Sequence, residues 1–198
     1  AQDYSGGKPI GYWKLDEGEG GTIYDWSGND HHGSLSLNGS PATSTAWQSA
    51  AGCKLNRCLD FDGADDYADI GSTGLPVYSI SLWFKADDIT AHTDYLIDLN
   101  GTDYITVVNG TVTVNGFAGA STSVYVNGLK NGVMANTADW HHLAITSNTG
   151  QTASDLEIAR LDNSYADGTI DEVKIFNYTL SPVQIRNEYN LGFGTYFK

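Results

Sequence analysis

The sequence lacks any apolar run that approaches the ~20 residues needed to span a bilayer, so it predicts no membrane insertion in this segment. Basic residues are also scarce, with 10 Lys and Arg against 24 Asp and Glu and a formal net charge of −14. Without a basic patch, the chain repels phosphate backbones and anionic lipid surfaces. We therefore expect no nucleic-acid partner, whereas cations are favoured. The same charge also suits solubility in an extracellular or salty setting.

Cysteine is nearly absent, because the chain contains only Cys53 and Cys58. Two cysteines without a nearby pair of histidines are a poor zinc-binding set. A disulfide that closes a short loop is the favoured interpretation, and it implies an oxidising compartment; two free thiols are the alternative. The chain begins with Ala1 rather than Met, which we expect of a mature or excised segment.

Glycine and tyrosine are abundant, with 23 and 12 residues, and they suit turns and strands better than helices. Apolar and polar residues alternate in short runs, as in Ile80–Lys85, which predicts half-buried strands. Asn109-Gly110 between two such runs predicts a hairpin with a type I′ turn. Strands are expected within 11–15, 59–63, 80–85, 95–99, 105–108, 111–114, 123–128, 140–146, 156–160 and 170–176.

One helix is predicted, over residues 179–189. Ser181 can cap its N-terminus, Pro182 fits its first position, and Leu180 can pack as a hydrophobic staple. Many short strands with one short C-terminal helix predict an all-β, two-sheet antiparallel jelly-roll sandwich. We expect residues 1–9 to form a lead-in segment and residues 10–198 a single domain, since no repeat or linker divides them.

A turn rich in oxygen ligands and glycine spans residues 25–33. Ca²⁺ prefers six to eight oxygens from carboxylates, amides, backbone carbonyls and water. Asp25 offers a carboxylate, while Asn29 and Gly33 belong to a loop that can turn its carbonyls inward. The alternative is a plain Asx turn at Asp25. His31 and His32 are adjacent and would point in opposite directions in a strand, which argues against a transition metal.

A second acidic group lies between residues 60 and 69. Its spacing differs from that of an EF-hand loop, and the Glu of the twelfth position is missing. We therefore interpret it as a solvated hairpin turn. Its members are Asp60, Asp62, Asp65, Asp66 and Asp69.

Exposed aromatic rings are the usual contacts of sugar-binding proteins, because ring faces stack on the C–H surfaces of sugars. Trp26 is the most suggestive candidate, since it lies inside the oxygen-rich turn. Tyr104 and Tyr125 are candidates on a concave sheet face. Core packing is the alternative for each of them. The other candidates are Tyr24, Trp47 and Tyr78.

Seven segments, in order along the chain, resemble the laminin-G-like jelly-roll domains of the concanavalin A-like lectin/glucanase superfamily. The resemblance runs from about Gly11 to Tyr189. The stretch 100–136 contains no recognisable ligand motif. The matching segments are Tyr12-Trp13-Lys14-Leu15-Asp16-Glu17-Gly18, Asp25-Trp26-Ser27-Gly28-Asn29, Cys58-Leu59-Asp60-Phe61-Asp62-Gly63-Ala64-Asp65-Asp66-Tyr67, Ile80-Ser81-Leu82-Trp83-Phe84, Trp140-His141-His142-Leu143-Ala144, Gly168-Thr169-Ile170-Asp171-Glu172-Val173-Lys174-Ile175 and Leu180-Ser181-Pro182.

The resemblance implies two curved antiparallel sheets, usually with one bound Ca²⁺, in an extracellular binding or adhesion module. By analogy with the family, Asp171 supplies a second carboxylate to the loop of Asp25, and Asp16 or Glu17 a third. The calcium ligands expected in this way are Asp25, Asn29, Gly33, Asp171 and Asp16.

Signatures of catalysis are missing from the sequence. The Glu-x-Asp-x-x-Glu pattern of the related glucanases is absent, and so is Gly-x-Ser-x-Gly. Asp60 and Asp62 have the spacing that a carboxylate pair on one strand needs, but they flank Phe61 in a stretch that the family uses structurally. We therefore expect no enzymatic activity.

These observations predict a secreted or cell-surface, Ca²⁺-stabilised, non-catalytic module that recognises a glycan or a cell-surface protein. Other copies or domains of a larger surface protein are further expected partners. Two alternatives stay open. One is a structural passenger domain of a pilus, filament or adhesin whose role is assembly, and the other is an accessory domain of a polysaccharide-degrading enzyme.

Overall fold

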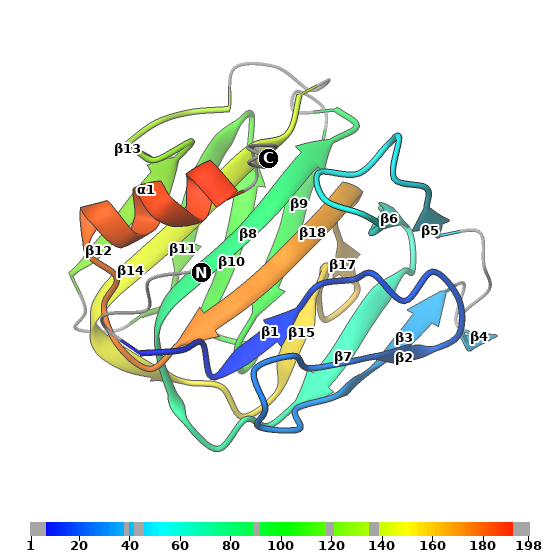
Figure 1. The fold of residues 1–198 in the computed structure, drawn as a ribbon, viewed down its shortest axis with the longest axis horizontal. Helices are drawn as coiled ribbons and strands as arrows, with labels where there is room; N and C mark the ends of the chain where they lie inside the picture. The colour runs from blue at the N-terminus through cyan, green and yellow to red at the C-terminus, as the bar shows by residue number, and fades with distance from the viewer. Residues whose placement is uncertain are drawn as a thin grey trace, which may run out of the picture.

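The computed structural model describes residues 7–37, 40–41, 46–88, 92–117, 121–134 and 139–191. Two antiparallel sheets and one short helix make up the fold, which confirms the all-β sandwich predicted from the sequence (Figure 1). None of the helical structure in these ranges is long and apolar enough to cross a membrane.

Sheet A contains eight strands, and its centre is the pair of long strands β8 and β18. Strand β1 (Gly11–Trp13) pairs with β18 beside the main path of the sheet. The order along that path is β13 (Leu129–Lys130), β12 (Thr122–Val126), β14 (His141–Thr152), β8 (Pro76–Ala86), β18 (Asp167–Phe176), β6 (Cys58–Asp62) and β5 (Trp47–Gln48).

Sheet B also contains eight strands, and β4 (Ser40–Pro41) pairs with β3 at its edge. A separate two-stranded hairpin joins β16 (Arg160–Leu161) to β17 (Ser164–Tyr165). The order along the main path of sheet B is β11 (Thr111–Asn115), β10 (Tyr104–Val108), β9 (Thr93–Asp98), β15 (Leu156–Ile158), β7 (Tyr67–Gly71), β3 (Gly33–Leu37) and β2 (Thr22–Ile23).

The turn between β10 and β11 shows why the sequence forms this hairpin. Asn109 and Gly110 both have positive φ values, 49° and 71°, as the two central positions of a type I′ turn require. The register pairs Val108 with Thr111 directly across the turn. The hairpin predicted at this dipeptide is therefore confirmed.

The core lies between the two sheets, and strand alternation decides which side chains reach it. In β8, Ile80, Leu82 and Phe84 belong to the main core cluster, so the residues between them face away from sheet B. Trp83 is one of these outward residues, and it is nevertheless buried. Around Trp83 the outer face of sheet A is covered, because the ring of Tyr189 stacks on Trp83 and the Lys54 ammonium lies 4.0 Å from the centroid of the Trp83 ring.

The helix α1 (Pro182–Leu191) begins where the sequence predicts, with Ser181 and Gln184 capping each other. The backbone N–H of Ser181 donates to Gln184 Oε1 at 2.9 Å, and that of Gln184 donates to Ser181 Oγ at 3.3 Å. In Figure 1 the helix (red-orange) lies across the strands of sheet A. It covers a second apolar cluster formed by Tyr125, Ala144, Phe176, Leu180 and Ile185.

A bulge in β18 shifts the register against β8 between Asp171 and Lys174. Glu172, inside the bulge, has a positive φ of 57°. The extra residue allows Asp171 and Lys174 both to pair with outward-facing residues of β8. Lys174 Nζ then donates to Glu188 Oε2 of α1 at 2.7 Å, which ties the helix to the sheet.

The first residues described already belong to this fold. The backbone N–H of Ile10 donates to Ile175 O at 2.9 Å, and Tyr178 donates its hydroxyl proton to Gly7 O at 2.7 Å. Residues 1–6 lie outside the described ranges, so the separation of a lead-in segment at residues 1–9 stays a prediction.

Candidate functional site

The carboxylate of Asp25 organises the oxygen-rich turn from within. Its Oδ1 accepts hydrogen bonds from the backbone N–H groups of Tyr12 at 2.9 Å and Ser27 at 2.8 Å. Its Oδ2 accepts from Ser27 Oγ at 2.8 Å and from the backbone N–H of His31 at 3.1 Å. A carboxylate has about four lone-pair positions, and these four donors occupy them. Asp25 therefore acts here as the fixed centre of the turn.

Asn29 and Gly33 also serve the local structure. Asn29 Nδ2 donates to Ile10 O at 3.0 Å, which joins the turn to the residue directly before β1. Gly33 begins β3, where a Cβ would come within 2.3 Å of Ile70 Cδ1 and 2.8 Å of Asp69 O. This position requires glycine because the neighbouring strand approaches so closely.

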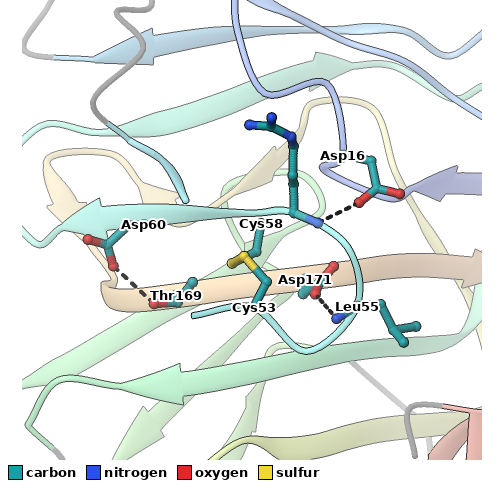
Figure 2. Close-up of a disulfide and its surroundings, with 8 residues drawn as sticks. Asp16, Cys53, Leu55, Cys58, Asp60, Thr169 and Asp171 are labelled. Atoms are coloured by element: carbon teal, nitrogen blue, oxygen red, sulfur yellow. Dashed lines mark hydrogen bonds between the residues drawn. A yellow bond between two sulfur atoms is a disulfide. The ribbon is translucent and has the colours of Figure 1, made fainter. Parts of the chain in front are cut away.

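The other two carboxylates expected as calcium ligands hold the disulfide loop, which we define as residues 53–58 (Figure 2). Asp171 Oδ2 accepts from the backbone N–H of Leu55 at 2.8 Å, and Asp16 Oδ1 accepts from that of Arg57 at 2.9 Å. The predicted disulfide is confirmed, since Cys53 and Cys58 are joined by an S–S bond. Asp171 and the disulfide thus fasten this loop to strands β18 and β6 of sheet A, and Asp16 fastens it to the segment after β1.

Asp171 lies in a strongly desolvated position. Its exposed fraction is 0%, and its Oδ1 is a buried atom without a hydrogen-bond partner. Burial, with the nearby carboxylates of Glu172 and Asp16, raises the pKa of Asp171 to about 9. With the groups that surround it here, the protonated form of this side chain is therefore favoured at neutral pH.

The acidic turn after β6 differs from the solvated turn predicted for it. Asp62, Asp65 and Asp66 bring carboxylate oxygens within 4.8 Å of one another. Asp66 is buried, and Asp65 Oδ1 is a buried atom without a hydrogen-bond partner. The sequence contains the signal, an Asp-Gly-Ala-Asp-Asp turn, but its spacing alone does not show that two of these side chains fold inward.

Two exposed rings flank the buried Asp25. Tyr24 is 49% exposed and Trp26 is 58% exposed, and we call this pair the Tyr24–Trp26 surface. The backbone N–H of Tyr24 donates to Glu17 Oε1 at 3.0 Å, and that of Trp26 donates to Tyr12 O at 2.7 Å. Both rings therefore project from a backbone that is already fixed.

Charged and aromatic neighbours surround this surface without covering it. The Lys14 ammonium lies 4.2 Å from the centroid of the Trp26 ring, a cation–π contact. The ring of Tyr24 meets that of His32 edge to face, with centroids 5.3 Å apart. These contacts set the ring orientations in the free protein.

The remaining aromatic candidates are less accessible. Tyr125 is 8% exposed and packs in the apolar cluster under α1, so it is a packing residue in this structure. Tyr104 is half-buried and packs against Tyr95, with ring centroids 6.1 Å apart. Trp47 belongs to the main core. The sequence did not show that α1 covers the face on which Tyr125 lies.

A serine–histidine pair lies under α1 and was not found from the sequence. Ser81 Oγ and His142 Nε2 are 2.9 Å apart on neighbouring strands β8 and β14. Both residues are buried, and burial lowers the pKa of His142 to about 3. His142 Nδ1 has no hydrogen-bond partner, and its ring packs against Trp83 and Tyr189. The pair borders a cavity of about 10 Å³, which is far smaller than a typical small-molecule site.

No family model matches the chain, and no curated protein matches it either. Among solved structures, it is similar to domain 4 of AbnA, a GH43 extracellular arabinanase from Geobacillus stearothermophilus, in complex with arabinotriose. The TM-score is 0.64 at 18% identity, over 92% of this chain and 98% of that chain.

Two further structures share the fold within larger proteins. Trypanosoma rangeli sialidase in complex with the inhibitor DANA matches with a TM-score of 0.58 at 15% identity, over 90% of this chain and 32% of the sialidase. A mutant of the protein HCR/D matches with a TM-score of 0.58 at 13% identity, over 92% of this chain and 51% of that chain. These likenesses define the chain as a β-sandwich, consistent with a jelly roll.

Proposed function

We propose that this chain is an extracellular, non-catalytic carbohydrate-binding module of the laminin-G-like type, and that it binds glycans at the Tyr24–Trp26 surface. The observation that carries the proposal is the arrangement around Asp25, where an inward carboxylate fixes the backbone and the two flanking rings point outward. Rigid aromatic rings stack on sugars with little loss of conformational entropy.

Two further observations support this proposal. The solved structure of AbnA domain 4 contains arabinotriose, and the other similar structure is a sialidase in complex with the inhibitor DANA, so this sandwich occurs in an arabinanase and in a sialidase. The Cys53–Cys58 disulfide suits an extracellular location. Because AbnA domain 4 is part of an arabinanase, the accessory domain of a polysaccharide-degrading enzyme is the favoured form of this function.

The proposal predicts weak binding that depends on Trp26. A single shallow surface immobilises little of a ligand, so we expect a Kd of about 0.1–1 mM, or about −4 to −5.5 kcal/mol. Trp26→Ala should weaken binding at least about tenfold on a glycan array, without a change in melting temperature. Leu129→Ala is the matched control, since Leu129 is 68% exposed on β13 and lies outside the surface.

Two results would contradict this proposal. Unchanged binding by Trp26→Ala would place the glycan elsewhere. An accumulation of reducing ends when the protein is incubated with a polysaccharide would show that the chain is catalytic.

Stabilisation by Ca²⁺ stays part of the proposal. The hydrogen bonds in the turn of Asp25, however, make another turn the better candidate for the ion. The four donors on Asp25 leave no free lone pair for a metal, so the turn around Asp25 fits Ca²⁺ poorly. The three clustered carboxylates of the turn after β6 match the oxygen chemistry of Ca²⁺ better.

Thermal melts with Ca²⁺ and with EGTA test this expectation. A ligand at a hundredfold excess over its Kd stabilises the folded state by about 2.7 kcal/mol. We expect a higher melting temperature in Ca²⁺, with the difference lost in Asp65→Asn and retained in Asp30→Asn, a change at an exposed carboxylate. Identical melts of the wild-type protein would end the calcium proposal.

A further inference from the structure

An open groove lies beside the disulfide loop, on the side of the loop that meets Asp16. Its volume is about 360 Å³, within the range of about 300–1,000 Å³ typical of small-molecule sites. Four of the five lining residues have polar side chains; the lining consists of Asp16, Ser49, Ala50, Asn56 and Arg57.

We propose that this groove binds a neutral sugar ring through adjacent hydroxyl groups, as a second subsite of the carbohydrate-binding module. The inference rests on the proposed function, because it names a further contact of the same kind of ligand. It differs from the Tyr24–Trp26 surface in its chemistry, since hydrogen bonding takes the place of ring stacking.

The groove offers acceptors and donors side by side. Each carboxylate oxygen of Asp16 accepts one hydrogen bond, Oδ1 from Arg57 N and Oδ2 from Asn56 Nδ2 at 3.1 Å, and each retains a second acceptor position. The carbonyl oxygen of Asn56 and the hydroxyl of Ser49 add two more polar groups. A sugar hydroxyl both donates and accepts, so it matches this mixture.

Arg57 supplies the strongest unused donor. Among the described residues, no carboxylate lies within the 4.0 Å of an ion pair with its guanidinium, and the guanidinium makes no hydrogen bond. Arg57 is exposed, so a ligand in the groove can reach its guanidinium. Its five N–H groups remain available to ligand oxygens.

The groove is built before a ligand arrives. Gly18 has a φ of +76°, and a Cβ there would come within 2.6 Å of Arg57 Nη1, so glycine allows the guanidinium to lie against the backbone. Asn56 has a positive φ of 43°, a conformation that the closed loop maintains. The disulfide and the bond from Leu55 N to Asp171 hold the same loop (Figure 2). A fixed site lowers the entropy lost on binding.

The charges favour a neutral sugar over an acidic one. Asp16 and Arg57 line the same groove. The carboxylate of a uronate attracted by Arg57 would therefore also be repelled by the negative charge of Asp16. The net charge of −14 adds a long-range repulsion of anionic glycans. The hydroxyl groups of a neutral sugar are subject to neither of these repulsions.

Side-chain NMR of the ¹⁵N-labelled protein tests the proposal. The probes are arabinotriose, cellotriose and mannotriose, with tri-galacturonate as the acidic comparison, each at about 10 mM, above the expected Kd of about 1 mM. At least one neutral trisaccharide should shift the Asn56 amide and Arg57 Nε–H signals. Arg57→Ala should weaken its binding about tenfold. Asp16→Asn, which keeps the side-chain volume, should also weaken it.

Arg186→Ala is the matched control, because Arg186 is an exposed arginine on α1. Shifts confined to the Trp26 indole, with wild-type binding by Arg57→Ala, would overturn the groove and leave the proposed function intact. Shifts at Arg57 with tri-galacturonate alone would overturn the neutral ligand. No shift at Asn56, Arg57 or Trp26 with any of the four probes would overturn the groove and the proposed function together.

Discussion

Asp25→Ala should destabilise the domain by about 3 kcal/mol or more, one of the largest effects expected of a single substitution here. The change removes the acceptor of four hydrogen bonds, three of them from the backbone N–H groups of Tyr12, Ser27 and His31. Donors left without a partner in a buried position each cost about 1–3 kcal/mol, and water that enters the turn recovers part of this. Urea denaturation followed by tryptophan fluorescence measures the difference.

Asp30→Asn is the matched control for this prediction, because asparagine tolerates the positive φ of 59° at this position. Asp30 belongs to the same turn, its side chain is 90% exposed, and its one ion pair, with His32, is long at 3.9 Å. An exposed pair of this kind contributes little to stability. Equal unfolding midpoints for the two variants would show that the Asp25 carboxylate does not organise the turn. Asp25→Ala should also weaken glycan binding, because the backbone that orients Trp26 loses its anchor.

The sequence was sufficient to predict the fold because the local signals agree with one another. The alternation in Ile80–Lys85 predicts a strand, and the Asn109-Gly110 turn predicts a hairpin. Both signals are compatible with the same fold, and both elements are present in it. The cap at Ser181 likewise marked the start of α1. The disulfide was predictable because the spacing of Cys53 and Cys58 leaves few other roles for a cysteine pair.

The site was harder to predict, since an oxygen-rich turn has the same composition whether its carboxylate binds a cation or backbone N–H groups. Only the positions of Tyr12 and His31 around Asp25 distinguish the two cases, and Tyr12 is distant in the sequence. The bulge at Glu172 had no sequence signal, yet it decides which residues of β18 face outward. The groove beside Asp16 depends on Arg57, a contact 41 positions away.

Asp171→Asn should make the protein more stable than the wild type at alkaline pH, and the two should converge in acid. The pKa of Asp171 is about 9 in the folded protein and about 3.9 in an unfolded chain. Between these values the folded state holds one more proton than the unfolded state, so wild-type stability falls as the pH rises. Asparagine resembles the protonated carboxyl group and can still accept the hydrogen bond from Leu55 N. Asparagine does not titrate, so the stability of the variant does not fall with rising pH in this way.

Urea unfolding of both proteins at several values between about pH 4 and pH 9 measures the effect. One proton is worth about 1.4 kcal/mol per pH unit, so we expect a difference of at least about 2 kcal/mol at pH 8. Other buried acids with raised pKa values, such as Asp94 and Glu172, are common to both proteins and largely cancel. Asp69→Asn, at an exposed position of β7, is the control and should follow the wild type. A difference between Asp171→Asn and wild type that stays constant over this range would mean that the Asp171 carboxyl group titrates alike in the folded and unfolded states.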